Sequence, residues 1–298
     1  MKILLLGGNG YIGSKFYQVF SDKYDIKSID LQLFRTTNYS EFANYNDILI
    51  DSYDIILCFA GHSSVQMCEY SPERSWINNV EYFHNLCKKL DNQKLIYMSS
   101  ASVYGNTDNI CSEDLNMNSR PIKDYDMQKI ICDIIANKYI SSGKNIIGLR
   151  LGTVNGSSPN TRRELMLNSM VKNSIESGNI KIKNLSMKRS ILGINDLMRA
   201  IDVIINNSCD SGQYNLASFT MNVKELADSV VSICNSNIVE EKSDNIFYSF
   251  EISTKKFEDH MNFEFLDKPD NIIKELMSNH LTTHYTIRDN DGNFKQYL

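Results

Sequence analysis

"LLLGGNGYIGSKF", residues 4–16, combines an apolar run, three spaced glycines and the start of a helical pattern. An apolar run that leads straight into glycines predicts a buried strand ending in a tight turn, and the following spacing predicts a helix over residues 12–21. Gly7 permits the tight turn, Gly10 lets backbone N–H groups approach a pyrophosphate, and Gly13 lets the helix pack closely against the sheet. The stretch therefore predicts a dinucleotide-binding unit.

The next predicted strand, "YDIKSID" at residues 24–30, ends in a carboxylate. Asp30 follows Gly13 at close to the spacing of about 20 residues at which such units carry an acidic side chain for the adenosine ribose. A carboxylate there repels a 2′-phosphate, so the sequence favours NAD over NADP. Arg35 lies nearby and is an alternative partner for a 2′-phosphate. A solvated turn residue is the other interpretation of Asp30.

The first half of the chain alternates short apolar runs with segments of helical apolar spacing. This alternation is typical of βαβ crossovers and of a parallel sheet covered by helices, an α/β fold of the doubly wound Rossmann type. We expect strands over residues 2–6, 24–30, 53–59, 94–100 and 145–154, and helices over residues 12–21, 71–90 and 125–140.

The second half is less regular, with helical spacing over residues 161–178, 195–207 and 221–234. No Gly/Ser-rich linker separates the halves, which argues for closely joined parts. We expect an NAD-binding Rossmann domain over residues 1–160 and a smaller, mostly helical substrate-binding lobe over residues 161–298. Some of the lobe, roughly residues 190–220, is expected to pack back on the first domain.

Composition sets the broad class of the protein. The chain has 298 residues, of which 42% are hydrophobic and 22% charged, as in ordinary globular proteins. Its formal net charge is −5 without a basic block, so nucleic-acid binding through phosphate neutralisation is not expected. The first apolar run, residues 3–6, is too short for a signal-peptide core or a membrane span, and no later run is long enough to cross a bilayer.

The cysteines and histidines show no pattern typical of disulfides or metal binding. The seven cysteines form no CxxC pair and the five histidines are dispersed, so neither a disulfide framework nor a metal site is predicted. Reduced thiols in a cytoplasmic compartment are the expectation.

A Tyr-x-x-x-Lys spacing occurs twice, as "YIGSK" at residues 11–15 and "YDMQK" at residues 125–129. Residues four apart share one helix face, and a nearby ammonium stabilises the phenolate form of a tyrosine, which makes the tyrosine usable as a base. Tyr11 and Lys15 straddle the glycine turn, at the phosphate end of the expected cofactor. We therefore interpret the first copy as coincidence.

"MSSASVYG" at residues 98–105 supplies a partner for the second copy. Ser100 closes a predicted strand, and open α/β sheets bind ligands at the carboxyl ends of strands. Tyr125 would act as acid/base, Lys129 would stabilise its phenolate and hold the nicotinamide ribose, and Ser100 would orient a substrate hydroxyl. Taken alone, each motif is explained as well by an ordinary amphipathic helix or a serine-rich turn.

The ordered set of motifs resembles the extended short-chain dehydrogenase/reductase family, in particular its NAD-dependent nucleotide-sugar epimerase/dehydratase branch, which includes UDP-galactose 4-epimerase. Similarity extends over about residues 1–278 and rests on "GGNGYIG" (7–13), "FAGHSSV" (59–65), "NNV" (78–80), "SSASVYG" (99–105), "YDMQK" (125–129), "RLGTVNG" (150–156), "RSILGINDLMRAI" (189–201) and "SGQYNLAS" (211–218).

The resemblance implies roles for individual residues. Catalysis is implied for Ser100, Tyr125 and Lys129. Cofactor contacts are implied for Gly7, Asn9, Gly10, Tyr11, Ile12, Gly13, Asp30, Leu31, Phe59, Ala60, Gly61, Asn78, Ser99, Tyr125 and Lys129. Substrate contacts are implied for Ser64, Ser100, Ser102, Thr153, Arg162 and Arg189. Arg189 would contact the nucleotide, and Arg163 is an alternative to Arg162 in a lid-like segment.

Departures from the family pattern bear on the reaction. Dehydratases of this branch carry an Asp–Glu pair directly after the catalytic Ser or Thr, whereas Ala101 and Ser102 stand there in this chain, which argues against dehydration. Thr153 stands where the epimerases commonly have a substrate-binding asparagine. The diphosphate-binding segment of the family is not evident, and residues 243–253 stand in its place.

The resemblance implies an NAD-dependent epimerase of a nucleotide sugar or related sugar, which transiently oxidises a hydroxyl to a ketone. An NAD(P)-dependent sugar oxidoreductase with net redox change is the first alternative, and a dinucleotide-binding protein without turnover is the second. Family members often dimerise through the helix that carries Tyr-x-x-x-Lys and the helix before the serine strand. A homodimer is therefore expected.

Overall fold

The structure, a computed structural model of the chain, describes residues 1–31, 39–118, 121–241, 249–279, 286–288 and 294–296. Arg35 and residues 243–248, which the sequence singled out, lie outside these ranges. Among the described residues, no helix has the length and apolarity to span a membrane, and no three metal-binding side chains gather into a site. All seven cysteines are described and are free thiols.

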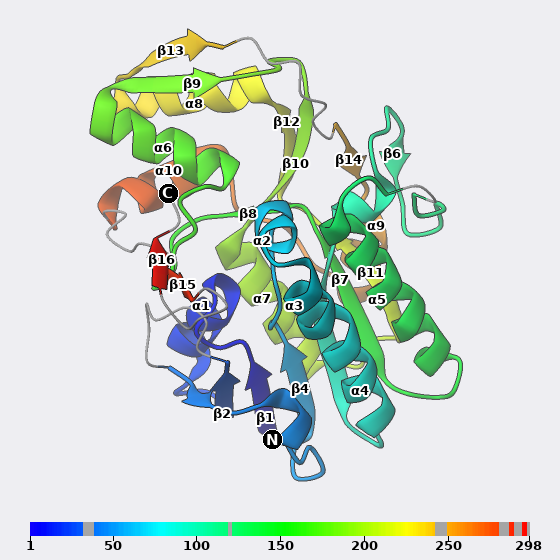
Figure 1. Ribbon diagram of the computed structural model, residues 1–298. Helices are drawn as coiled ribbons and strands as arrows, with labels where there is room; N and C mark the ends of the chain where they lie inside the picture. Colours follow the sequence, from blue (N-terminus) through cyan, green and yellow to red (C-terminus); the bar gives the residue numbers. More distant parts are fainter. Residues whose placement is uncertain (32–38, 119–120, 242–248, 280–285, 289–293, 297–298) are drawn as a thin grey trace.

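A seven-stranded parallel sheet forms the centre of the molecule (Figure 1). Its order is β11-β7-β5-β4-β1-β2-β3, and every neighbouring pair runs parallel. The strands are β1 (Lys2–Leu6), β2 (Asp25–Asp30), β3 (Glu41–Phe42), β4 (Ile55–Cys58), β5 (Lys94–Ser100), β7 (Ile146–Leu151) and β11 (Gly212–Leu216). The expected Rossmann-type α/β architecture is confirmed.

Alternate side chains of these strands enter two separate cores. On β1, Ile3 and Leu5 pack with α1 and α7, whereas Leu4 and Leu6 pack with α4 and α5 on the other face. A strand covered on both faces is apolar at every position, which explains why "KILLL" does not alternate. The helices are α1 (Tyr11–Phe20), α7 (Ile194–Asn206), α4 (Tyr82–Lys89) and α5 (Asp124–Ile140).

The stretch predicted as one helix over residues 71–90 is divided. It forms α3 (Pro72–Trp76), a π-helical turn (Ile77–Glu81) and α4, and a further short helix, α2 (Val65–Tyr70), precedes it. π-Helical turns are rare, and those that occur often lie at functional sites. This one carries Asn79, which is 6% exposed and whose side chain faces inward.

A smaller lobe lies beyond the carboxyl ends of the strands (Figure 1). Its helices α6 (Met166–Ser177), α8 (Val223–Cys234) and α10 (Pro269–Ser278) share an apolar core with the parallel pair β9 (Asn179–Ile182) and β13 (Asn237–Glu240). The remaining strands and α-helix are the sheet of β8 (Thr153–Asn155), β10 (Lys188–Gly193) and β12 (Phe219–Asn222), the pair β6 (Ile110–Cys111) and β14 (Glu251–Ile252), helix α9 (Lys255–Met261), and the pair β15 (Thr286–Arg288) and β16 (Phe294–Gln296).

Residues from the second half of the chain also belong to the central layer. β11 pairs with β7 in the main sheet, and α7 covers one face of that sheet. The division of the chain at residue 160 stays a prediction.

The helix predicted over residues 161–178 begins later, at Met166. Side-chain contacts hold the preceding residues in a different path. Arg162 Nη1 donates to Ser63 O at 2.9 Å, and Asn168 Nδ2 donates to Arg162 O at 2.8 Å. The start of the prediction was therefore wrong because tertiary contacts, which apolar spacing does not register, determine the local backbone.

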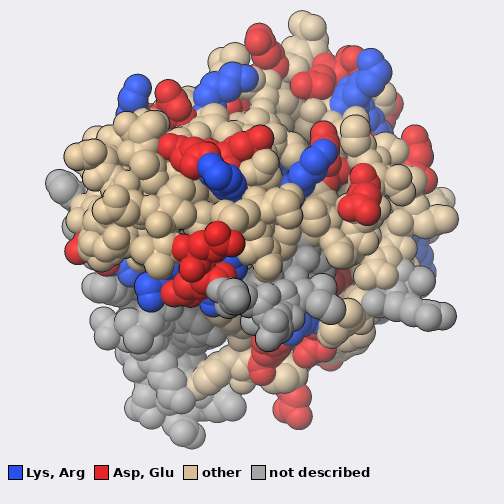
Figure 2. All heavy atoms as spheres, turned by 90° about the horizontal axis from the view of Figure 1, so that it is seen from above, with Lys and Arg blue, Asp and Glu red and all other residues tan. Residues whose placement is uncertain are grey.

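Acidic and basic side chains are interspersed on the face of the molecule seen in Figure 2. Lys181 on β9 and Lys183 just after it pair with Glu241 at 3.0 and 3.4 Å, and on α8 Lys224 pairs with Asp228 at 2.6 Å. Exposed pairs of this kind contribute about 0–1 kcal/mol each, so the apolar core beneath them holds the lobe together.

A buried ion pair joins helix α5 to the sheet. Arg150 Nε on β7 donates to Asp133 Oδ2 at 2.8 Å, and Tyr97 OH on β5 donates to Asp133 Oδ1 at 2.7 Å. Arg150 Nη1 also donates to Tyr104 OH at 2.9 Å. Asp133 is 0% and Arg150 3% exposed, so these contacts replace the water that both charges lose on folding.

Removing one partner of this pair is expected to destabilise the protein. Asp133→Leu leaves the Arg150 guanidinium buried without its carboxylate, which costs about 3–5 kcal/mol in comparable pairs. The double variant Asp133→Leu/Arg150→Met removes both charges and is expected to recover most of that loss. Urea denaturation followed by circular dichroism gives the midpoints, and a double variant as unstable as the single one would contradict the prediction.

Candidate active site

The glycine turn between β1 and α1 has the conformation that its residues predict. Gly7 has a φ of +87°, and a Cβ there would lie 2.6 Å from Ala60 N. A Cβ on Gly13 would lie 2.1 Å from Gly7 O, so α1 can pack against the turn only because residue 13 is glycine. The turn thus presents backbone without side chains at the N-terminus of α1, where anionic groups are favoured.

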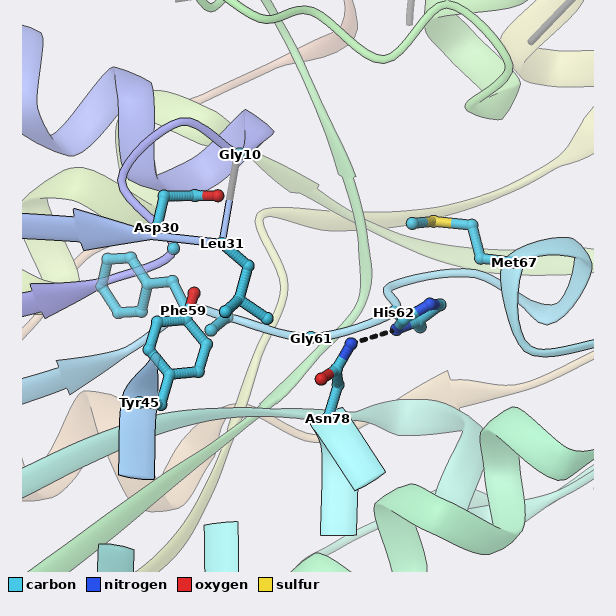
Figure 3. Close-up of a pocket in the computed structure, with 11 residues that line it drawn as sticks. Gly10, Asp30, Leu31, Tyr45, Phe59, Gly61, His62, Met67 and Asn78 are labelled. Atoms are coloured by element: carbon cyan, nitrogen blue, oxygen red, sulfur yellow. Dashed lines mark hydrogen bonds between the residues drawn. The ribbon is translucent and has the colours of Figure 1, made fainter. Parts of the chain in front are cut away.

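Asp30 lies beside this turn at the end of β2. It is 6% exposed, and its Oδ2 accepts a hydrogen bond from Asn9 N at 3.0 Å. Asn160 Nδ2 in turn donates to Asn9 O at 2.7 Å. Asp30 lines a small cavity of about 40 Å³ together with Gly7 and with residues labelled in Figure 3, among them Gly10. The structure therefore brings the predicted carboxylate to the glycine turn.

The turn Phe59–His62 follows β4 and lines both this small cavity and a larger one. Asn79 holds it with both atoms of its amide. Asn79 Oδ1 accepts from His62 N at 2.7 Å, and Asn79 Nδ2 donates to His62 O at 3.0 Å. Gly61 has a φ of +137°, and a Cβ there would lie 2.5 Å from Asn79 Oδ1. A side chain at residue 61 would therefore displace the Asn79 amide.

His62 is a neutral hydrogen-bonding group in this turn. Burial, with a further contribution from the charge of Arg74, lowers the pKa of His62 to about 4. Its Nδ1 lies 3.4 Å from Asn78 Nδ2 (Figure 3), and an amide nitrogen can only donate. Nδ1 is therefore the acceptor, which leaves Nε2–H as a donor at the edge of the two cavities.

The larger cavity has a volume of about 570 Å³ and lies between the carboxyl ends of the strands and the smaller lobe. This volume is within the range of about 300–1,000 Å³ that small-molecule sites occupy. Ser100, Tyr125 and Lys129 all line it. Residues that are far apart in the chain thus meet at one surface, as their spacing predicted.

Tyr125 and Lys129 lie one turn apart on α5, with Lys129 Nζ 5.7 Å from the centre of the Tyr125 ring. Lys129 Nζ donates to Met98 O on β5 at 2.7 Å. Burial opposes the charge of the ammonium, but the attraction of Tyr125 and of nearby cysteine thiols outweighs it and raises the pKa of Lys129. A fixed cation therefore lies beside the tyrosine.

Ser100 ends β5, and its Oγ accepts a hydrogen bond from Ser102 N at 3.2 Å. Ser99 and Ser102 line the same cavity, and their buried hydroxyls have no hydrogen-bond partner among the described residues. Buried hydroxyl groups without partners are costly, so these two are available to a bound ligand.

The other Tyr-x-x-x-Lys copy has different contacts. Tyr11 OH donates to Gly156 O at 2.8 Å, and burial raises the pKa of Tyr11. Lys15 pairs with Glu275 on α10 at 3.1 Å. Tyr11 and Lys15 are therefore held by separate partners, in agreement with their interpretation as a chance repeat.

The cavity also includes the residues that the sequence offered for substrate: Ser64, Ser100, Ser102, Thr153, Arg162 and Arg189. Arg162 Nε donates to Glu164 Oε1 at 2.7 Å, whereas Arg163 lies near Glu176 on α6, at 4.0 Å. Only Arg162 of the neighbouring pair lines the cavity.

Most of the predicted cofactor residues line one of the two cavities: Gly7, Gly10, Asp30, Leu31, Phe59, Ala60, Gly61 and Asn78 the smaller, and Tyr11, Ile12, Ser99, Tyr125 and Lys129 the larger. Asn9 and Gly13 lie behind the turn and support it. The roles of all these residues stay predictions.

Sequence reasoning missed other lining residues. Tyr45, His62 and Met67 line the smaller cavity, and Glu164, Met166, Met170, Lys181, Lys183, Met187, Val223 and Phe250 line the larger one. The position of His62 directly after Phe59–Gly61 was a usable signal. The missed residues of the lobe had no such signal, because those on β9, α6 and α8 and in the adjoining loops reach the cavity only through the tertiary fold.

Comparison with known proteins gives consistent results. The model of the "NAD dependent epimerase/dehydratase family" matches residues 3–217. An ADP-L-glycero-D-manno-heptose-6-epimerase of Brachyspira hyodysenteriae is 28% identical over 238 residues, which cover 72% of this chain and 74% of the relative.

Two solved structures are similar in fold. UDP-glucuronic acid 4-epimerase from Bacillus cereus, in complex with UDP-glucuronic acid and NAD, has a TM-score of 0.80 and 16% identity and covers 93% of this chain and 98% of its own. dTDP-glucose 4,6-dehydratase from Bacillus anthracis, in complex with NAD, has a TM-score of 0.77 and 19% identity and covers 94% and 97%.

The environment of His62 predicts a pH dependence of stability. The unfolded chain takes up a proton near the ordinary histidine pKa of about 6.5, whereas folded His62 does so only near pH 4. Stability is therefore expected to fall as pH is lowered from about 6.5 to about 4. Thermal melts of the wild type and of His62→Gln across this range measure the effect. The variant is expected to lose less stability on acidification, and parallel curves would contradict the assignment.

Proposed function

Because the chain belongs to the NAD-dependent epimerase/dehydratase family, we propose that it is an epimerase of a nucleotide sugar. It would invert a carbinol carbon by oxidising the hydroxyl to a ketone and reducing the ketone on the other face. The observation that carries the proposal is the presence of Ser100, Tyr125 and Lys129 in one cavity that adjoins the glycine turn.

The residues present fit NAD. The glycine turn has no room for side chains at Gly7 and Gly13, which suits close approach of a pyrophosphate to the N-terminus of α1. Asp30 lies where an adenosine ribose would be bound, and its carboxylate favours NAD over NADP. The turn Phe59–His62 joins the two cavities, so a dinucleotide can extend from Asp30 towards Tyr125.

Side chains of the protein would transfer the proton of the substrate hydroxyl. NAD, when bound, supplies the hydride acceptor and donor. Tyr125 would take the proton of the substrate hydroxyl and return it later, with the Lys129 ammonium close to its ring. Lys129 is held to Met98 O, so its charge stays beside the phenol through both steps. Ser100 would hydrogen-bond the same substrate oxygen and orient it.

A nucleotide sugar suits the charges of the cavity. Arg162, Arg189, Lys181 and Lys183 line it, and these cations are appropriate for a diphosphate. The similar heptose epimerase is named for an ADP-linked sugar, and the similar B. cereus structure holds UDP-glucuronic acid. The sugar itself would lie near the unpartnered hydroxyl groups of Ser99 and Ser102.

Epimerisation is favoured over dehydration by the residues that follow Ser100. Elimination of water needs a base for the proton next to the ketone and an acid for the leaving hydroxyl. Ala101 has no titratable group and Ser102 has a weak one, so neither can do this work. An oxidoreductase would use the same site for a single hydride transfer and would exchange its cofactor with solution. The balance of NAD and NADH therefore distinguishes an oxidoreductase from an epimerase.

We propose further that the protein acts in the cytoplasm as a homodimer that pairs α4 and α5 with those of a second copy. Exposed apolar side chains support this, among them Ile77 at 41% in the π-helical turn before α4 and Ile134 at 54% on α5.

The function is tested by a screen of nucleotide sugars, with products followed by NMR and bound cofactor followed by absorbance. The expected result is interconversion of two epimers with no net change in NADH. Steady accumulation or consumption of NADH in proportion to product would identify an oxidoreductase, and a 4-keto-6-deoxy product would identify a dehydratase. Absence of turnover with every sugar tested would favour a binding protein.

Tyr125→Phe is expected to reduce turnover by at least about 100-fold, because general acid–base groups contribute about 10²–10⁴ to rates. NAD binding should be retained, since the ring remains. Tyr139→Phe, on the same helix but outside both cavities, is the matched control and should keep wild-type turnover. Wild-type rates in Tyr125→Phe would remove this residue from the mechanism.

A further inference from the structure

Gln128 lies inside the "YDMQK" stretch but has no part in the proposed chemistry. It is 1% exposed, and both ends of its amide are bound. Gln128 Nε2 donates to Ser75 Oγ on α3 at 2.9 Å, and Gln128 Oε1 accepts from Asn79 Nδ2 at 2.6 Å. A buried amide directly before Lys129 thus reaches out from α5 to two other helical segments.

The contact with Asn79 fixes the side chain that holds the turn Phe59–His62. Asn79 Nδ2 has two hydrogens, of which one is donated to His62 O and the other to Gln128 Oε1. Asn79 Oδ1 accepts from His62 N, so every polar group of this amide is used. If Gln128 loses its oxygen, one buried N–H of Asn79 retains only the weak contact with Cys68 Sγ at 3.9 Å, and the amide is held less firmly on His62.

We propose that Gln128 is a positioning residue that couples the turn Phe59–His62 to the helix of Tyr125 and Lys129. The turn borders both cavities, whereas Tyr125 and Lys129 line the larger one. A hydrogen-bond path from α5 through Gln128 and Asn79 therefore sets where the dinucleotide lies relative to the proton-transfer pair. The inference rests on the proposed role of this turn in holding NAD.

Ser75 fixes the outer end of this hydrogen-bond path. Ser75 Oγ donates to Pro72 O at 2.8 Å, so it accepts from Gln128 in a fixed direction. Cys68 Sγ on α2 adds a weaker contact to Gln128 Oε1 at 3.5 Å. A nonpolar residue at position 128 would therefore remove the hydrogen bonds that join α5 to α2, α3 and the π-helical turn.

The experiment is calorimetric titration of NAD into protein freed of cofactor, compared among matched variants. Gln128→Met keeps the length of the side chain and removes its hydrogen bonds, and it is expected to weaken NAD binding about tenfold. Gln128→Glu keeps an oxygen acceptor for Asn79 Nδ2 and is expected to restore affinity to within about threefold of wild type.

Gln213→Met is the control for loss of a buried amide. Gln213 is 8% exposed, and its Nε2 donates to Asn137 Oδ1 at 3.0 Å, away from both cavities. It is expected to lower the melting temperature as Gln128→Met does but to leave the Kd for NAD within about twofold. Equal Kd values in Gln128→Met and wild type, or equal weakening in both Met variants, would overturn the coupling.

If Gln128→Met does not fold, Ser75→Ala provides the same test, because it removes the outer anchor and leaves Gln128 in place. About threefold weaker NAD binding is then expected, and unchanged binding would overturn the proposal. Wild-type protein that binds no NAD would overturn the proposed function and the coupling together. Wild-type protein that binds NAD without any epimerase activity would overturn only the proposed function.

Discussion

Two charged side chains on one stripe of α5 fix the orientation of this helix on the sheet. Lys129 and Asp133 are four residues apart, and each is bound to a strand: Lys129 to the Met98 carbonyl on β5, Asp133 to Arg150 on β7. Charges that lose their water must find partners, so a helix rotated by one residue would leave both unpaired. Tyr125, one turn earlier on the same stripe, is thereby directed into the cavity.

The order of the strands fixes the glycine-rich side of the site. Strand order brings β1, β4 and β5 side by side, so the turns that follow them meet at one edge of the sheet. Gly7 packs against the backbone of residues 59 and 60, and this contact tolerates no side chain. The site is thus built from adjoining strand ends, and its two outer walls, α5 and the π-helical turn, are joined by buried amides.

The sequence was informative wherever a local pattern carries a local consequence. Continuous apolar runs located the buried strands, the spacing of glycines located the turn, and "YDMQK" was correctly placed on a helix. Patterns failed where distant contacts decide. The segment before Met166 has helical spacing, but Arg162 is drawn to Ser63 instead, and no periodicity could show that. Burial of Asn79, Gln128, Asp133 and Arg150 was equally invisible, because polar residues enter a core only with partners that the fold supplies.

Fold and reaction are separable here, since structures that share this fold include an epimerase and a dehydratase. Both chemistries begin with the removal of hydride and proton from a carbinol, and a tyrosine–lysine pair serves either. The two chemistries differ in whether acid and base groups lie beside the ketone, and the family resemblance implies that the two residues after Ser100 would supply them. Ala101 and Ser102 provide no such groups, which is the reason for proposing that a ketone formed in this cavity is reduced rather than dehydrated. The wall of the cavity contributed by β9, α6 and α8 lies apart from Tyr125 and Lys129 on α5, so under the proposed function it can differ with the substrate without altering the proton transfer.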